Sequence, residues 1–231
     1  MSAQPPFRLF PLSAVPLGEA IMPAPESLNA QLTTLFLKLE QDGAAYRTQV
    51  QRDTQHGLFE SKFDLHLRKE PEVRNLFGFI HMSLAGLVKE LNEYSEAEMG
   101  QLRFDYHSWF HVTRTGGYQG MHNHPNASWS GIYCVDPGDD DGNINSGAVR
   151  FHDARVNADM YSDPGNERMR APYRLGGLHL RHTPGRLLLF PSYILHEVFP
   201  YTGQRPRIVV AFNAWCWWAD RDNLANPYRK A

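Results

Sequence analysis

The chain has 231 residues, of which 42% are hydrophobic and 21% charged, and its formal net charge is -2. This composition is typical of a globular protein with a sizeable core, and it offers no basic surface for nucleic acid or an anionic membrane. No stretch approaches the roughly 20 apolar residues of a membrane span. Cys134 and Cys216 indicate free thiols, and the first residues lack the basic start and apolar run of a secretory signal. We therefore expect a cytoplasmic protein.

Two amphipathic helices are predicted in the first hundred residues. Leucines recur at helical spacing within residues 23–43, with Gly43 as the stop, and a similar apolar pattern runs from Pro71 to Tyr94. The intervening residues 46–67 are polar and are expected to be irregular. Both helices should pack against the outside of a sheet.

From Gln101 onward, short apolar segments alternate with glycine and proline turns, which is the pattern of a β sandwich or barrel. We expect one domain over residues 1–231, in which residues 1–100 support a core formed by residues 101–231. Residues 157–173 form a polar insertion that either covers a substrate or is a surface loop. Three tryptophans near the C-terminus predict core packing or a subunit contact, the latter in a homodimer.

Three histidines are the main candidates for chemistry. His122 and His124 stand two apart in a segment predicted to be extended, where alternate side chains share a face, and His196 lies on a distant strand. Neutral imidazole suits iron, zinc, copper and nickel, and this arrangement resembles the facial ligand set of non-haem Fe(II). The alternative is that they are hydrogen-bonded core residues, since the chain has eleven histidines. Their adjacency favours a shared metal, because protonated imidazoles would repel each other.

The segments around these histidines resemble the 2-oxoglutarate/Fe(II)-dependent oxygenase superfamily, and within it a small family of microbial oxygenases with prolyl-hydroxylase-like cores. Between Phe104 and Asn213, five segments fall in the family's order: SWFHVTRTGG, MHNHPNASWSGIYCV, SGAVRFHDAR, TPGRLLLFPSYILHEVFPYTG and RPRIVVAFN. The resemblance implies a mainly β protein with flanking N-terminal helices (α+β), whose core is a double-stranded β-helix, the cupin-like jelly roll.

Carried over residue by residue, the resemblance makes His122 and His196 ligands of Fe(II). At position 124 most of the superfamily has Asp or Glu, and the histidine found here removes one negative charge from the ligand set. We prefer His124 as the third ligand. The alternative is a carboxylate from Asp153 or Glu197, although Glu197 directly follows His196 and would point to the opposite face of a strand.

The resemblance also implies an anchor for the far carboxylate of 2-oxoglutarate, about ten positions after the distal histidine. Arg207 fits the family's pattern, and its planar guanidinium can bind a carboxylate through two hydrogen bonds. The alternative is a surface arginine at the start of a strand. Tyr133 and Asn213 are weaker candidates for the same pocket, with core packing and strand termination as their alternatives.

The implied reaction couples oxidative decarboxylation of 2-oxoglutarate to succinate with hydroxylation of a small-molecule or peptide substrate by O₂. Two other enzyme classes use three histidines on a cupin-like barrel: direct dioxygenases, which need no keto acid, and zinc hydrolases or isomerases. A non-catalytic jelly-roll binding protein is the third alternative. Loss of Arg207 should abolish turnover of the keto acid but need not affect a direct dioxygenase. Activity that survives without oxygen would indicate a zinc hydrolase or isomerase.

Overall fold

A computed structural model describes residues 11–12, 14–50, 52–139, 142–155 and 160–219. The N-terminal elements are β1 (Gly18–Ile21), α1 (Glu26–Gln41), η1 (Gly43–Ala45), β2 (Gln55–Glu60), η2 (Leu65–Leu67), α2 (Pro71–Asn92) and α3 (Glu96–Gln101). The strands that follow are β3 (Leu102–His122), β4 (Trp129–Asp136), β5 (Val149–Phe151), β6 (Leu178–Leu180), β7 (Arg186–Pro191), β8 (His196–Val198) and β9 (Arg207–Trp218).

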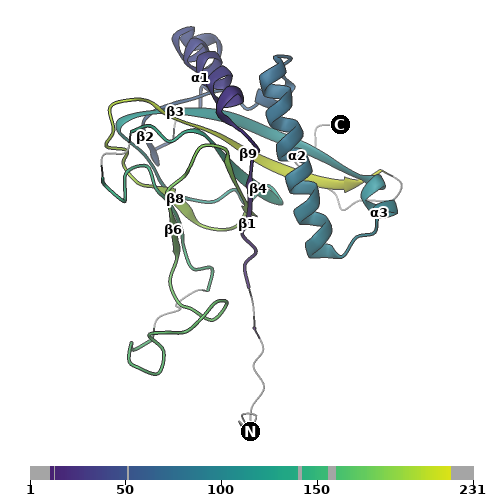
Figure 1. The fold of residues 1–231 in the computed structure, drawn as a ribbon, viewed down its shortest axis with the longest axis vertical. Helices are drawn as coiled ribbons and strands as arrows, with labels where there is room; N and C mark the ends of the chain where they lie inside the picture. Colours follow the sequence, from purple (N-terminus) through teal and green to yellow (C-terminus); the bar gives the residue numbers. More distant parts are fainter. Residues whose placement is uncertain (1–10, 13, 51, 140–141, 156–159, 220–231) are drawn as a thin grey trace.

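The strands form one curled antiparallel sheet in the order β1-β7-β4-β9-β3-β8-β5-β6, and β2 pairs with β3 off this path. Strand β3 pairs with β9 through its first half and with β8 at its end, so it passes from one layer of the fold to the other. The long strands β3 and β9 run side by side across the molecule (Figure 1). The mainly β jelly roll with flanking helices is thereby confirmed.

Helices α1 and α2 lie on one side of the long strands (Figure 1). Pro71 occupies the first turn of α2, where its missing N–H costs nothing. Alternation along β9 divides the core in two, because Ile208 and Val210 face the helix-side cluster while Val209 joins a second cluster inside the curl of the sheet. The inner cluster also contains Ile132, Val149, Phe151, Leu188, Phe190 and Ile194.

Two predictions about the N-terminal half need correction. Residues 46–67 are not irregular throughout, because β2 forms there and pairs with β3, with a register shift near Gly57. The positive φ of 62° at Gly57 and its close approach to Gly117 require glycine at this point. Helix α3 was also not predicted, although Ser95 and Glu98 form a capping box at its start.

The tryptophan cluster and the insertion are only partly described. Trp218 packs against the helix-side core and its ring meets that of Tyr94, which fits the core-packing alternative. Residues 157–159 of the insertion, and 220–231 after the tryptophans, lie outside the described residues. No helix in the described part of the chain has the length and apolar character needed to cross a membrane.

Candidate functional site

Strands β3 and β8 bring the three predicted histidines together. His122, the last residue of β3, is the Cα partner of His196 at the start of β8. His124 stands two residues beyond the end of β3 and just before the turn at residues 125–126. Its backbone N–H donates to the Ser192 carbonyl at 2.8 Å, which ties this segment to the residues that precede β8.

The three imidazoles converge on one point. Their candidate ligand nitrogens all lie within 4.8 Å of one another. The ring centroids are 4.3 Å apart for His122 and His196, 5.1 Å for His122 and His124, and 5.3 Å for His124 and His196. In the described part of the chain, no other group of three His, Cys, Asp or Glu side chains is arranged in this way.

The hydrogen bonds of two of these rings fix their tautomers. His122 Nδ1 lies 2.8 Å from the Gly120 carbonyl oxygen, and His196 Nδ1 lies 2.9 Å from that of Ile194. A carbonyl only accepts hydrogen bonds, so each Nδ1 carries the proton and donates it. The Nε2 lone pair of each ring is left available, which is the usual arrangement of metal-binding histidines.

Burial keeps the three imidazoles neutral. It lowers the pKa of His124 and of His196 to about 3, with a further lowering by the neighbouring histidines, and it also lowers the pKa of His122. Metal ions bind the neutral form of the ring. The residues present therefore fit a divalent cation such as Fe(II), which needs no proton to be displaced from them at neutral pH.

The carboxylates considered as alternative ligands have other partners. Asp153 pairs with Arg155 at 2.6 Å. Glu197 faces the outer side of its strand, where Arg150 and His152 approach it at 3.4 Å and 3.1 Å. Neither belongs to the group of side chains that could share an ion with the three histidines.

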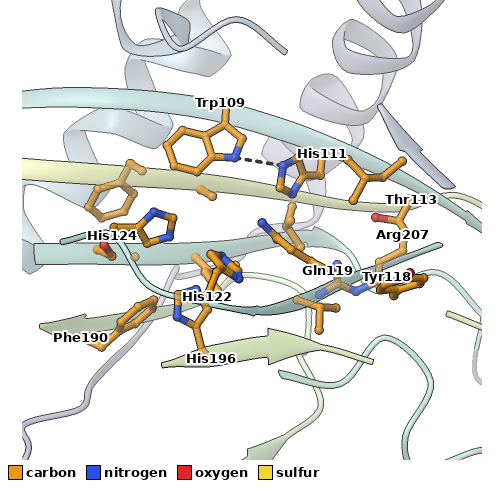
Figure 2. A pocket seen from close by; sticks show the side chains of 18 residues that line it. Trp109, His111, Thr113, Tyr118, Gln119, His122, His124, Phe190, His196 and Arg207 are labelled. Atoms are coloured by element: carbon orange, nitrogen blue, oxygen red, sulfur yellow. Dashed lines mark hydrogen bonds between the residues drawn. The ribbon is translucent and has the colours of Figure 1, made fainter. Parts of the chain in front are cut away.

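Arg207 lies at the far end of the cavity that the three histidines line (Figure 2). It is the first residue of β9, pairs in register with Thr113, and is only 3% exposed. Its Nη2 is buried without a hydrogen-bond partner. A Cβ on Gly147 would lie 2.7 Å from Arg207 Cδ, so only glycine leaves room for the arginine stem. A buried cation without a partner is costly, and a carboxylate of a ligand in this cavity would satisfy it.

The segment that carries the site matches a known protein family. Residues 107–213 match the family model described as "Putative 2OG-Fe(II) oxygenase". This segment contains all three histidines and Arg207. The match covers just under half of the chain and confirms its resemblance to the 2-oxoglutarate/Fe(II)-dependent oxygenase superfamily. The description of the family names 2OG and Fe(II). A search of curated protein sequences finds no match.

Solved structures share the fold of this oxygenase at low sequence identity. A prolyl-4-hydroxylase from Pseudomonas putida has a TM-score of 0.59 and 13% identity, covering 86% of this chain and 91% of that one. The epimerase SnoN in complex with Fe³⁺, alpha-ketoglutarate and nogalamycin RO has a TM-score of 0.58 and 11% identity, covering 93% of this chain and 87% of that one. A Trichoplax adhaerens prolyl hydroxylase in complex with a peptide fragment of hypoxia inducible factor has a TM-score of 0.53 and 15% identity, covering 86% of this chain and 83% of that one.

Two predicted cofactor contacts of the oxygenase need correction. Tyr133 points to the helix side of the sheet, where its hydroxyl donates to Asn29 Oδ1 at 2.8 Å and its ring meets Phe79. It therefore lies on the opposite face of β4 from the cavity. Asn213 does not line the cavity either, and its Oδ1 accepts a 2.7 Å hydrogen bond from Ser130, which does.

One group beside the oxygenase site was not predicted from the sequence. His111 Nε2 lies 2.9 Å from Glu60 Oε2 and 3.0 Å from Trp109 Nε1 (Figure 2). An ionised carboxylate only accepts hydrogen bonds, so this nitrogen carries a proton and donates it to Glu60. Burial alone would raise the pKa of Glu60, but His111, Gln55 and Arg52 outweigh it and hold this pKa at about 2. The cavity is thus bordered by an ionised carboxylate that is bound to one of its lining imidazoles. Glu60 went unnoticed because β2 itself was not predicted.

Proposed function

We propose that this oxygenase hydroxylates its substrate, with His122, His124 and His196 as the Fe(II) ligands and Arg207 as the anchor of 2-oxoglutarate. The observation that carries the proposal is that one cavity contains both the three histidines and Arg207. Three neutral imidazoles offer nitrogen donors at one end. At the other end lies a buried guanidinium whose Nη2 has no hydrogen-bond partner among the described residues. A dicarboxylate that reaches from one to the other would complement both.

The protein's own groups bind and orient the cosubstrate. Arg207 would hold the far carboxylate through charge-assisted hydrogen bonds, and Thr113 stands beside it in register on β3. His111 and Val209, the next register pair on the same faces, line the cavity between the anchor and the histidines. The apolar lining excludes water and keeps the reacting groups in place. Fe(II) held by the three imidazoles would supply oxygen activation, coupled to oxidative decarboxylation of the keto acid.

Arg207 also supports this function over the alternatives. A direct dioxygenase or a zinc hydrolase needs the three imidazoles but no buried guanidinium in the same cavity. A non-catalytic jelly roll needs neither. The described geometry therefore favours an enzyme that takes a keto-acid cosubstrate.

The proposal is tested by incubating the Fe(II)-loaded protein with 2-oxoglutarate and O₂ and measuring succinate. We expect slow succinate formation even without a primary substrate, and its loss in Arg207→Met. Succinate formation that is unchanged in Arg207→Met would rule out the anchor. Hydrolase activity that persists under anaerobic conditions with zinc would favour the zinc alternative.

A further inference from the structure

The largest of the described cavities lies between the end of β5 and residues 169–178, and we call it the loop cavity. Its volume is about 720 Å³, within the range of small-molecule sites. The end of β5, the insertion, the stretch before β1 and the turn after β7 all contribute to its wall. Its apolar lining includes Leu17, Phe151, Leu178, Phe190 and Ile194.

The loop cavity borders the candidate metal centre. Phe190 lines both cavities. The Phe190 and Phe151 rings lie against that of His196, with centroid distances of 4.9 Å and 6.0 Å. Tyr193 also lines the loop cavity, and its carbonyl accepts a 3.2 Å hydrogen bond from Asn123, which lies between two of the candidate ligands. A molecule in the loop cavity would therefore contact residues that also border the candidate metal centre.

The charges on the wall of the loop cavity are unbalanced. Arg155 is neutralised by Asp153, which accepts from both its Nε and its Nη2. Arg170 and Arg174 also line the cavity, and neither forms an ion pair within the described residues. The cavity thus combines an apolar floor with two cationic groups that lack an anion, and this pairing is complementary to an amphipathic anion.

We propose that the loop cavity binds the primary substrate, and that this substrate is a small apolar molecule carrying a carboxylate. The assignment of the occupant as the substrate rests on the proposed oxygenase function. The cavity's preference for such a molecule follows from its own residues and is independent of that function.

The test uses the iron-free full-length protein and two probes of equal shape, 2-naphthoate and its neutral analogue 2-naphthamide, with binding measured by calorimetry. We expect 2-naphthoate to bind about tenfold more tightly than the amide, from two exposed ion-pair contacts. The Arg170→Gln/Arg174→Gln double variant should abolish this preference while leaving amide binding unchanged. Arg168→Gln, an exposed arginine of the same insertion that does not line the cavity, is the matched control and should behave as wild type.

Three results would overturn the proposal: equal affinity for the two probes, a preference that survives in the double variant, or a preference that is lost in Arg207→Met. The last would place 2-naphthoate in the cosubstrate site. The test also separates this inference from the proposed function. Failure of 2-naphthoate binding with intact 2-oxoglutarate binding removes only the substrate class. Intact 2-naphthoate binding together with failed 2-oxoglutarate binding would contradict the oxygenase proposal and leave an anion-binding cavity.

Discussion

Replacing Arg207 with methionine should weaken cosubstrate binding without weakening the fold. A hydrogen bond to a charged group contributes about 1.5–3 kcal/mol, and the guanidinium can form two with a carboxylate. We expect a loss of about 3–6 kcal/mol, or about 100-fold to 10,000-fold in affinity for 2-oxoglutarate. The same cation is buried with Nη2 unpartnered when no ligand is bound. An apolar side chain of similar volume at such a site is often neutral or stabilising, so the ligand-free variant should unfold at the same temperature or higher.

The assay combines anaerobic titration of 2-oxoglutarate in the presence of Fe(II) with thermal unfolding of the ligand-free protein. Arg205→Met is the matched control, because Arg205 is exposed and pairs with Asp136 and Asp139 at the surface. It should leave 2-oxoglutarate affinity unchanged. Affinity within twofold of wild type in Arg207→Met, together with a clear drop in unfolding temperature, would show that this arginine is structural and refute the reasoning.

Three further predictions follow from the site and its surroundings. His122→Ala and His196→Ala should each reduce bound Fe(II) at least tenfold by metal analysis, with His152→Ala as a control; wild-type iron content in both would end the metal assignment. Gly147→Ala should weaken 2-oxoglutarate binding without changing iron content, because the new methyl group would displace the Arg207 stem; unchanged affinity would contradict this. His182 is buried with both ring nitrogens unpartnered, and burial lowers its pKa to about 3 from 6.5. Between pH 3 and pH 6.5 the unfolded chain binds more protons at His182 than the folded protein does. The free energy of unfolding therefore falls as the pH drops below about 6.5. In wild type the free energy of unfolding should fall from pH 7.5 to 5.5, and in His182→Leu this fall should be smaller by about 1.4 kcal/mol in urea unfolding. An equal fall in wild type and variant would refute the claim that His182 is buried in its neutral form.

The sequence predicted the parts of the site that depend on motif order. His122, His196 and Arg207 stand in segments whose order and spacing mark the superfamily, and the structure brings them to one cavity. His124 was expected beside them from its spacing to His122. Its backbone hydrogen bond to Ser192 was not predicted, because a contact between distant segments leaves no local sequence pattern.

The error at Tyr133 arises because alternation gives two faces of a strand without saying which face points inward. Tyr133 was assigned to the pocket although Ser130, Gly131 and Ile132 are the residues of β4 that line it. Strand β2 escaped notice because its pattern is set by pairing with β3 rather than by apolar alternation. Glu60 was lost with it, since its role depends on meeting His111 across that pairing.

The most direct test of the central claim is an anaerobic titration of the protein with Fe(II) and then 2-oxoglutarate, followed by visible absorption. If three imidazoles and Arg207 form one cofactor site, a weak charge-transfer band should appear only when both are present, and half-saturation should shift to much higher 2-oxoglutarate in Arg207→Met. Absence of the band in wild-type protein that retains its iron would contradict the account.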